Sequence, residues 1–271
     1  MLITVKTYPN PSDTYGEVVC VAGVRLDSTP KSWIRLYPMR FRNIDADLRF
    51  KKYDIIEIDI RKRDRRDLRI ESYRPDQTTL QVVDHVNPDN GQWNQRRELL
   101  GPLIGSTTTC ELIRANPQGH MGFPARSLGL IKPQVRSVTV TQGPAWTPSQ
   151  LAKAMVASAP PLFGTRMTTL EPMLYRLVYQ YRCADSSCRG HQQQCIDWEL
   201  GAAARQLVRK YGPIEAKARL YEKWERMMTS PARDLHFFVG NQARRRRSFE
   251  VLGTWYPRMP AGADRDQLTL F

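Results

Sequence analysis

Alternating hydrophobic and polar positions characterise the first 140 residues of the chain. Residues 53–60 show the pattern clearly, because Ile56, Ile58 and Ile60 fall on one face of an extended segment. Similar strand patterns occupy residues 2–8, 17–26, 33–37, 68–73, 80–86 and 128–141, the last interrupted by Pro133. One short helix is expected at 94–103. Many short strands with a single short helix predict a small barrel or a strongly bent sheet, of an OB-like or PUA-like kind.

One glycine within these strands carries a structural expectation of its own. Gly23 interrupts the apolar run 17–26. A glycine inside a strand is typical of a bulge or of a close approach by another backbone. We therefore expect either a bulge or a close backbone approach at this position.

The second half of the chain mixes strands with amphipathic helices. Tyr175, Leu177, Tyr179 and Tyr181 alternate with polar residues and predict one buried face of a strand at 174–182. Further elements are expected as helices at 196–211 and 214–228, split by Gly212-Pro213, and as strands at 235–239 and 249–256, joined by a turn at 240–248. This composition predicts an α+β unit.

Glycine and proline residues that interrupt regular secondary structure indicate where one domain ends and the next begins. The segment 143–148 reads Gly-Pro-Ala-Trp-Thr-Pro, and a helix is expected to begin at Pro148. We therefore predict an α+β fold with a β-rich, barrel-like domain at 1–143 and a zinc-stapled α+β domain at 148–259. A flexible tail is expected at 260–271.

The zinc expectation comes from a cysteine and histidine cluster with the spacing Cys183-x4-Cys188-x2-His191-x3-Cys195. Thiolate and imidazole groups are the ligands that a tetrahedral Zn²⁺ site uses. His191 and Cys195 are four residues apart and would share one face if they lie on a helix. A plant-type iron–sulfur cluster begins with the same C-x4-C-x2 spacing but continues with cysteine. The remaining alternative is a set of free thiols with His191 at the surface.

The charge of the chain indicates a polyanionic partner. Its formal net charge is +14, which favours nucleic acid first and an anionic membrane surface second. No stretch is long and apolar enough for a membrane-spanning helix, and the N-terminus has no signal-peptide pattern. We expect a cytoplasmic protein. An odd count of five cysteines then favours metal ligation over a disulfide framework.

Three basic clusters are candidate nucleic-acid contacts. Guanidinium groups match the oxygens of a phosphate, and neighbouring aromatic rings can stack on unpaired bases. For Trp33 and Phe41 the favoured alternative to stacking is packing in the core. The candidate contacts are Arg35, Arg40 and Arg42; Arg61, Lys62, Arg63, Arg65 and Arg66; and Arg244, Arg245, Arg246 and Arg247. No helix-turn-helix is visible, so contacts to the nucleic-acid backbone are expected to dominate over base recognition.

The sequence contains no clear catalytic motif, and we lean against an enzyme. A metal-dependent nuclease needs clustered carboxylates. Glu57 and Asp59, on one face of the strand at 53–60, are weak candidates for metal ligands. Asp197 and Glu199 are expected to point in different directions from the start of a helix, with Trp198 packed beside the zinc. There is no P-loop, dinucleotide fingerprint or nucleophile elbow.

The chain ends in a small-residue, polar spacer followed by Gln267-Leu-Thr-Leu-Phe271. These five residues resemble the Gln-Leu-x-Leu-Phe peptide that bacterial replication and repair proteins use to bind the sliding clamp. The resemblance implies that Gln267 hydrogen-bonds at the rim of the clamp pocket and that Leu268, Leu270 and Phe271 fill it. The alternative is docking of this tail on the protein's own surface.

The rest of the chain is faintly similar to uncharacterised bacterial zinc-knuckle proteins, a resemblance that carries no mechanism. Taken together, the sequence predicts a DNA-binding or RNA-binding accessory protein recruited to the sliding clamp. It would act in DNA maintenance, mobile-element biology or genome defence. The alternative function is a metal-dependent nuclease or another enzyme acting on nucleic acid.

Overall fold

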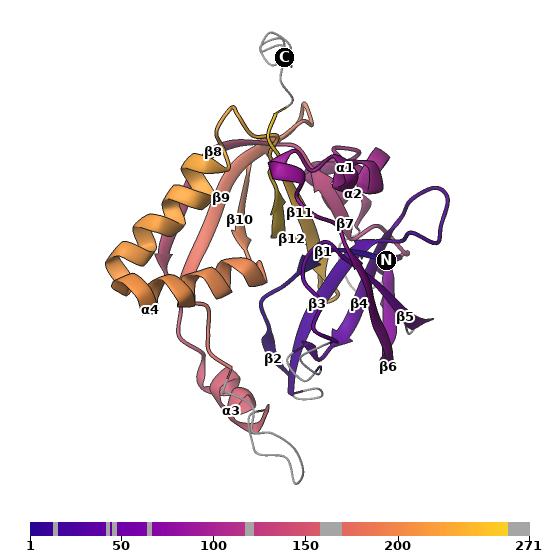
Figure 1. Ribbon diagram of the computed structural model, residues 1–271, viewed down its shortest axis with the longest axis horizontal. Coiled ribbons are helices and arrows are strands. Elements are labelled where there is room, and N and C mark those ends of the chain that lie inside the picture. The colour runs from indigo at the N-terminus through magenta and orange to yellow at the C-terminus, as the bar shows by residue number, and fades with distance from the viewer. Residues whose placement is uncertain are drawn as a thin grey trace.

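The computed structural model shows two closed or nearly closed sheets joined by short helices, with one long helix on the second sheet (Figure 1). The structure describes residues 1–12, 16–41, 44, 48–63, 67–116, 122–157 and 170–259. The α+β class expected from the sequence is confirmed.

The N-terminal unit is a small β-barrel. Its strands are β1 (Leu2–Lys6), β2 (Asn10–Ser12), β3 (Gly16–Val24), β4 (Trp33–Met39), β5 (Asp54–Lys62) and β6 (Ser72–His85). They are ordered β1-β5-β6-β4-β3, and β1 also pairs with β3, so the ring closes. Strand β2 extends the sheet beside β3. The predicted barrel is therefore confirmed, with one long strand β6 where two shorter strands were expected.

Gly23 has the close neighbour that its position in β3 predicted. A Cβ atom at Gly23 would lie 1.9 Å from the carbonyl oxygen of Leu2 on β1. The register of the β1–β3 pair also shifts between Ile3 and Val5, which marks an irregularity of the bulge type. A side chain at position 23 would push these two strands apart and open the barrel.

A helical connection leads to the second unit. It comprises the 3₁₀ turns η3 (Asp89–Gly91) and η4 (Gly101–Leu103) and the helices α1 (Asn94–Leu100) and α2 (Thr109–Ala115). Thr108 caps α2, accepting a hydrogen bond from the Glu111 backbone N–H, while the Glu111 carboxylate accepts one from the Thr108 N–H. This reciprocal capping box fixes where α2 begins.

The second sheet has the order β7-β11-β12-β10-β9-β8. Its strands are β7 (Leu128–Ile131), β8 (Pro133–Gln142), β9 (Tyr175–Cys183), β10 (His191–Cys195), β11 (His236–Gln242) and β12 (Arg245–Trp255). Only Lys132 separates β7 from β8, yet β7 pairs with β11 and β8 pairs with β9. One bent strand therefore joins the two edges, and the sheet curls back on itself.

This pairing corrects the predicted domain boundary. Residues 128–142 belong to the second sheet, so a boundary at 143–148 is wrong, and the division falls in the helical connection instead. Gly143 is a packing position rather than a linker. Its N–H donates to the Leu174 carbonyl over 2.8 Å, and a Cβ there would lie 1.8 Å from the Met173 carbonyl oxygen.

The two longer helices contact different sheets. Helix α3 (Pro148–Ala157) begins at the predicted proline, contacts β2 and β3 of the barrel, and projects below the body of the molecule in Figure 1. Helix α4 (Trp198–Tyr221) continues into a π-helical turn, η5 (Glu222–Met227). Gly212 interrupts α4 with a φ of +78°, just before Pro213, so the two predicted helices are confirmed. Leu200, Leu220 and Trp224 belong to the hydrophobic cluster that α4 and η5 share with the sheet.

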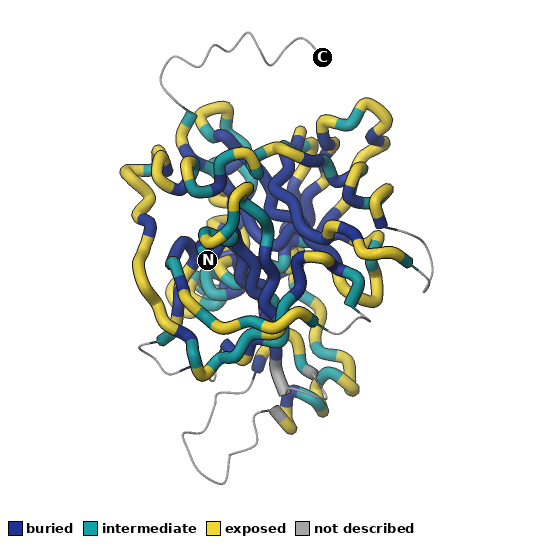
Figure 2. The backbone as a smooth tube through the Cα atoms, turned by 90° about the vertical axis from the view of Figure 1, so that its right-hand side faces the viewer, coloured by how far each residue is buried: buried dark blue, intermediate teal, exposed yellow. Residues whose placement is uncertain are grey.

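The two units share a buried interface. Trp93 of the connection packs at 4.9 Å between ring centroids against Trp255 of β12 and at 5.3 Å against Tyr53 of the barrel. Figure 2 shows buried segments at the centre of the molecule, and buried residues of both units belong to one hydrophobic cluster. Lys52 Nζ of the barrel also lies 2.6 Å from the Asp197 carboxylate at the start of α4, and both side chains are buried.

Candidate metal centre and nucleic-acid interface

Four side chains converge on one point between α2 and the β9–β10 hairpin. They are Cys110, Cys183, Cys188 and His191, and their ligand atoms all lie within 4.8 Å of one another. His191 Nε2 is 3.4 Å from the Sγ atoms of Cys110 and Cys188 and 3.5 Å from that of Cys183. In a tetrahedral zinc site with the usual bond lengths, sulfur and nitrogen ligands lie about 3.5 Å apart. The group therefore has the composition and spacing of a four-ligand metal site.

Local structure explains how the chain brings three of these ligands together. Cys183 ends β9, a tight turn follows, and the Cys188 N–H donates to the Asp185 carbonyl over 3.0 Å. Gly190 has a φ of +105°, which returns the chain to β10 so that His191 pairs opposite Tyr181.

The fourth ligand comes from a helix 81 residues away from His191 in sequence. Cys110 lies in the first turn of α2. A chain of hydrogen bonds fixes that turn, since Thr109 Oγ1 lies 2.8 Å from the Tyr181 hydroxyl, which donates to Gln193 over the same distance. Arg114 of α2 forms an ion pair with Asp185 of the turn. These contacts hold α2 against the hairpin independently of any ion.

The surroundings favour metal ligation by these groups. Burial lowers the pKa of His191, so its imidazole is neutral and able to donate a lone pair near neutral pH. Burial opposes ionisation of Cys188, but hydrogen bonds from the backbone of Cys183 and Gly190 outweigh it and lower the pKa of this thiol. The pKa of Cys110 is raised, by burial first and then by the neighbouring Cys183 and Cys188. A divalent cation at the centre would relieve this mutual repulsion.

Cys195 does not belong to the group, which corrects the predicted ligand set. The segment His191–Cys195 is strand β10 and not the first turn of a helix. In a strand, residues four apart are separated by about 13 Å, whereas on a helix they are neighbours. Cys195 is fully buried where β10 pairs with β9 and β12. Cys110 occupies the place that the sequence assigned to Cys195.

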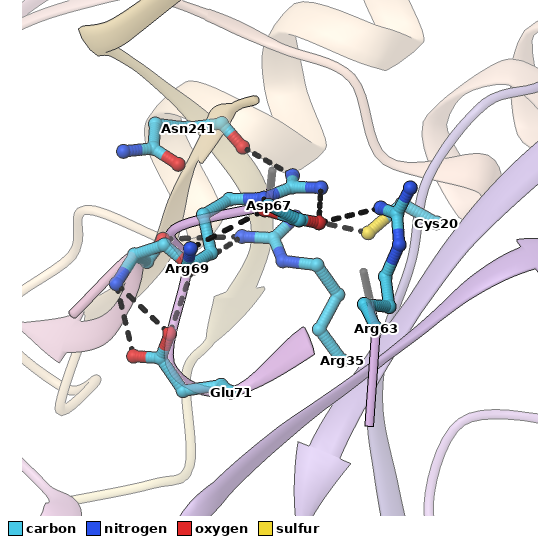
Figure 3. A network of polar contacts seen from close by, with 8 residues as sticks. Cys20, Arg35, Arg63, Asp67, Arg69, Glu71 and Asn241 are labelled. Carbon is cyan, nitrogen blue, oxygen red and sulfur yellow. Dashed lines mark hydrogen bonds and ion pairs between the residues drawn. The ribbon is translucent and has the colours of Figure 1, made fainter. Parts of the chain in front are cut away.

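Two of the predicted basic clusters lie next to each other. Arg69 Nη1 donates to the Asn241 carbonyl over 3.3 Å, which links the segment after β5 to the end of β11. Asp67 forms ion pairs with Arg63 at 2.6 Å and with Arg69 at 2.8 Å, as Figure 3 shows. Burial opposes ionisation of Asp67, but Arg69 and Arg63 hold its pKa below the usual value.

The arginine-rich run is the tip of the β11–β12 hairpin. The strands end at Gln242 and resume at Arg245, so the turn is shorter than predicted. Arg246 lies partly buried next to this network: burial lowers its pKa, Asp67 opposes that shift and Arg69 adds to it. Arg246 Nη2 also donates to the backbone carbonyl of Phe123, a residue that is 63% exposed. The basic tip therefore contacts the backbone of an exposed aromatic residue.

Arg35 is a structural residue and not a surface contact. It is only 2% exposed. One Nη atom donates to the Ser127 carbonyl and the other to Cys20 Sγ, and the Ser127 N–H and hydroxyl donate to the buried Glu71 carboxylate. Arg35 therefore joins the barrel to the segment that leads into the second sheet. Figure 3 shows Arg35 between Cys20 and Glu71.

The other predicted contacts that the structure describes lie mostly at the surface. Lys62 donates to the Ile70 carbonyl, and Arg247 donates to that of Asn116, yet both residues are exposed. Arg40, Arg61, Arg244 and Arg245 are exposed as well. Arg42, Arg65 and Arg66 and the tail residues Gln267, Leu268, Leu270 and Phe271 lie outside the described residues.

Trp33 and Phe41 pack against other aromatic side chains, which was the favoured alternative to stacking on bases. Trp33 packs edge-on against Phe238 at 6.1 Å, and Phe41 packs against Phe50 and Trp198 at 4.9 and 5.3 Å. Trp198 thus contacts the N-terminal barrel, and the expectation that it packs beside the metal ligands is wrong.

The acidic pairs do not form a second metal site. Glu57 and Asp59 are exposed on β5, and neither belongs to the one group of potential metal ligands found among the described residues. Asp197 and Glu199 do converge, contrary to expectation, but on Lys52 Nζ, at 2.6 and 3.5 Å. The pKa of Lys52 is raised because Asp197 and Glu199 outweigh the effect of burial. Asp197 also caps α4, since its side chain accepts a hydrogen bond from the Glu199 N–H.

Sequence reasoning missed Cys110 and the network around Asp67. The sequence did offer one indication of Cys110, since it is one of the two cysteines outside the Cys183-to-Cys195 motif and begins an amphipathic segment.

Among the described helices, none has the length and apolar character needed to cross a membrane.

Two protein-family models match the chain. Residues 1–102 match a domain of unknown function, DUF8758, and residues 105–271 match a second, DUF8757. The division between the matches falls in the helical connection, where the strand pairing also divides the chain. No curated protein matches it. Because the second match covers more than half of its length, the chain belongs to the DUF8757 family.

Proposed function

We propose that this protein binds nucleic acid, DNA in the first place, on one basic surface. The surface, here called the arginine face, consists of Lys62, Arg63 and the hairpin tip Arg244 to Arg247, and the buried Arg69 links its two parts. The observation that carries the proposal is the hydrogen bond from Arg69 to the Asn241 carbonyl at 3.3 Å, which brings the segment that follows Lys62 and Arg63 to the end of β11, next to the hairpin tip.

The charge balance of the arginine face supports a polyanionic ligand. Asp67 is shared by Arg63 and Arg69, while Arg244 and Arg245 extend from the hairpin turn into solvent. Neighbouring guanidinium groups repel one another unless an anion lies between them. Phosphate suits this arrangement because it accepts paired hydrogen bonds from arginine. The exposed residue Phe123, whose backbone Arg246 contacts, adds an aromatic ring on which an unpaired base can stack.

We propose Zn²⁺ as the ion of the Cys110, Cys183, Cys188 and His191 group, with a structural role. All four tetrahedral positions would be filled by protein ligands, which is typical of structural zinc and leaves no place for a reacting water. The ion would tie α2 to the β9–β10 hairpin and so hold the connection between the two units. The histidine among three cysteines argues against an iron–sulfur cluster.

The tail suggests where such a protein would act. We propose that Gln267 to Phe271 binds the bacterial sliding clamp in the manner of the peptide it resembles. The chain would then be an accessory factor at DNA, in DNA maintenance, mobile-element biology or genome defence, and it would reside in the cytoplasm with both partners. Only the resemblance of these five residues supports this part of the proposal.

Binding of fluorescent oligonucleotides tests the proposal directly. Single-stranded DNA, duplex DNA and RNA would each be titrated with the full-length protein and followed by fluorescence anisotropy. We expect binding that weakens at least tenfold in the Arg244→Ala/Arg245→Ala variant. The matched control is Arg176→Ala/Arg182→Ala, since these two exposed arginines lie on β9, separated from β11 by β10 and β12. Equal affinity in both variants would contradict the arginine face as the binding surface.

A further inference from the structure

A cavity of about 330 Å³ lies where the barrel meets the helical connection and β7. Residues that follow β3, begin β4, lead into β6 and precede α2 and β7 all contribute to its wall. This volume is at the lower end of the range for small-molecule sites, so the cavity holds one small group and not a larger cofactor.

The wall combines aromatic rings with positive charge. Trp33 and Tyr73 contribute rings, and Arg25, Lys31 and Arg126 contribute cations. Arg25 is neutralised by Asp27, at 2.6 Å. Within the described part of the chain, the Lys31 and Arg126 side chains form no ion pair. Two cations are therefore available to a ligand, on a wall that also offers flat apolar surface.

One acidic residue restricts which ligand suits the cavity. Glu71 lies on the wall, and its carboxylate accepts hydrogen bonds from the Ser127 N–H and hydroxyl at 2.9 Å. This carboxylate disfavours a ligand that is anionic throughout, such as inorganic phosphate. A ligand with one anionic end and one neutral, planar end matches the wall better.

We propose that this cavity binds one nucleotide unit, with its phosphate toward Lys31 and Arg126 and its base against the aromatic wall. The cavity adjoins the arginine face, since its wall residue Ile70 follows Arg69 directly in the chain. It also includes Arg126, three residues after Phe123, whose carbonyl Arg246 contacts. A strand held on the arginine face could thus place one nucleotide in the cavity, as proteins that extrude a base do. The inference rests on the proposed function only for this origin of the nucleotide.

Titration of the full-length protein with the four 5′-deoxymononucleotides, and separately with inorganic phosphate, tests the cavity. Calorimetry should show at least one mononucleotide binding tenfold or more tightly than phosphate. That affinity should fall more than tenfold in Lys31→Ala/Arg126→Ala and stay within twofold in Arg244→Ala/Arg245→Ala. Mononucleotide binding no tighter than phosphate, or insensitive to the Lys31 and Arg126 changes, would overturn the proposal. Thermal unfolding of each variant checks that the fold is retained.

A competition experiment separates the two sources of the nucleotide. If an unlabelled oligonucleotide displaces the mononucleotide, the cavity takes a nucleotide of a strand; if both bind together, it takes a free nucleotide, and both results support the cavity. Mononucleotide binding without any oligonucleotide binding would overturn the proposed nucleic-acid function while leaving the cavity proposal standing.

Discussion

His191 Nε2 lies 3.4 Å from Cys110 Sγ, although 81 residues separate the two in the chain. This contact unites the helical connection with the β9–β10 hairpin and defines the metal site more sharply than the local cysteine spacing does. It also separates two candidate ligands, because Cys110 is in the group and Cys195 is not.

Replacement of Cys110 should therefore remove the metal, whereas replacement of Cys195 should not. Mass-spectrometric metal analysis of purified protein should find about one zinc per chain for the wild type and for Cys195→Ala, and little for Cys110→Ala. Because metal binding contributes directly to folding, a chelator should lower the melting temperature of the wild type. Loss of zinc in Cys195→Ala with retention in Cys110→Ala would contradict the assignment.

Lys52→Met should destabilise the protein strongly. It leaves the Asp197 carboxylate buried without its 2.6 Å partner, and removing one member of a buried pair costs about 3–5 kcal/mol. The matched control is Glu199→Gln, which removes a partner at 3.5 Å with a side chain 53% exposed and should cost less than about 1 kcal/mol. Urea unfolding measures both, and equal losses would show that Asp197 is not the dominant partner.

Acid should destabilise the fold through His236. Burial lowers the pKa of this residue to about 4, although Asp234 opposes the shift. The unfolded chain, with a normal histidine pKa of about 6.5, then binds the proton more readily than the folded one. The stabilising effect of the neutral form is complete above about pH 6.5 and declines as the pH falls toward 4. His236→Gln should flatten that part of the stability profile measured by urea unfolding, and an unchanged slope would refute the role of His236.

Removal of residues 267–271 should abolish binding to a bacterial sliding clamp and leave oligonucleotide binding unchanged. The reason is that the tail is proposed to contact the clamp only, while the arginine face contacts nucleic acid. Surface plasmon resonance on immobilised clamp measures the first effect, and anisotropy measures the second. A truncated protein that still binds the clamp would show that Leu268, Leu270 and Phe271 are not the contact.

The sequence was informative where the relevant interactions are local. The alternation Ile56, Ile58, Ile60 predicted β5, Gly212-Pro213 predicted the break in α4, and Gly23 predicted a close backbone approach. Each depends on the conformational preference of a few adjacent residues, so a single chain segment is enough to reveal it.

Non-local pairing accounts for the errors. The polar segment His191–Cys195 has little periodicity of its own, and it becomes a strand because β9 and β12 pair with it. Similarly, β7 and β8 form a single bent strand of the second sheet. The glycine and prolines that follow Gln142 led to the wrong prediction that a domain ends there. Tertiary context decided both cases, because the strands that pair with these segments lie far away in sequence.

In the candidate sites, too, local features were visible in the sequence and features that depend on tertiary contacts were not. Three of the four ligands came from one motif, whereas Cys110 required knowledge of how α2 packs. Basic clusters were visible as sequence runs, but only the fold distinguishes the buried Arg35 from the exposed Arg244 and Arg245. Burial of a long charged side chain depends on partners such as Ser127 that no local pattern identifies.

The salt dependence of DNA binding tests the central claim most directly. The slope of log affinity against log salt concentration would be measured for the wild type, Lys62→Ala/Arg63→Ala, Arg244→Ala/Arg245→Ala and the combined variant. Since each phosphate contact contributes about 0.9 to the slope, each double variant should reduce its magnitude by about 1–2, and the combined variant by the sum. A wild-type slope near zero, or one that neither pair of substitutions changes, would contradict an arginine face built from both clusters.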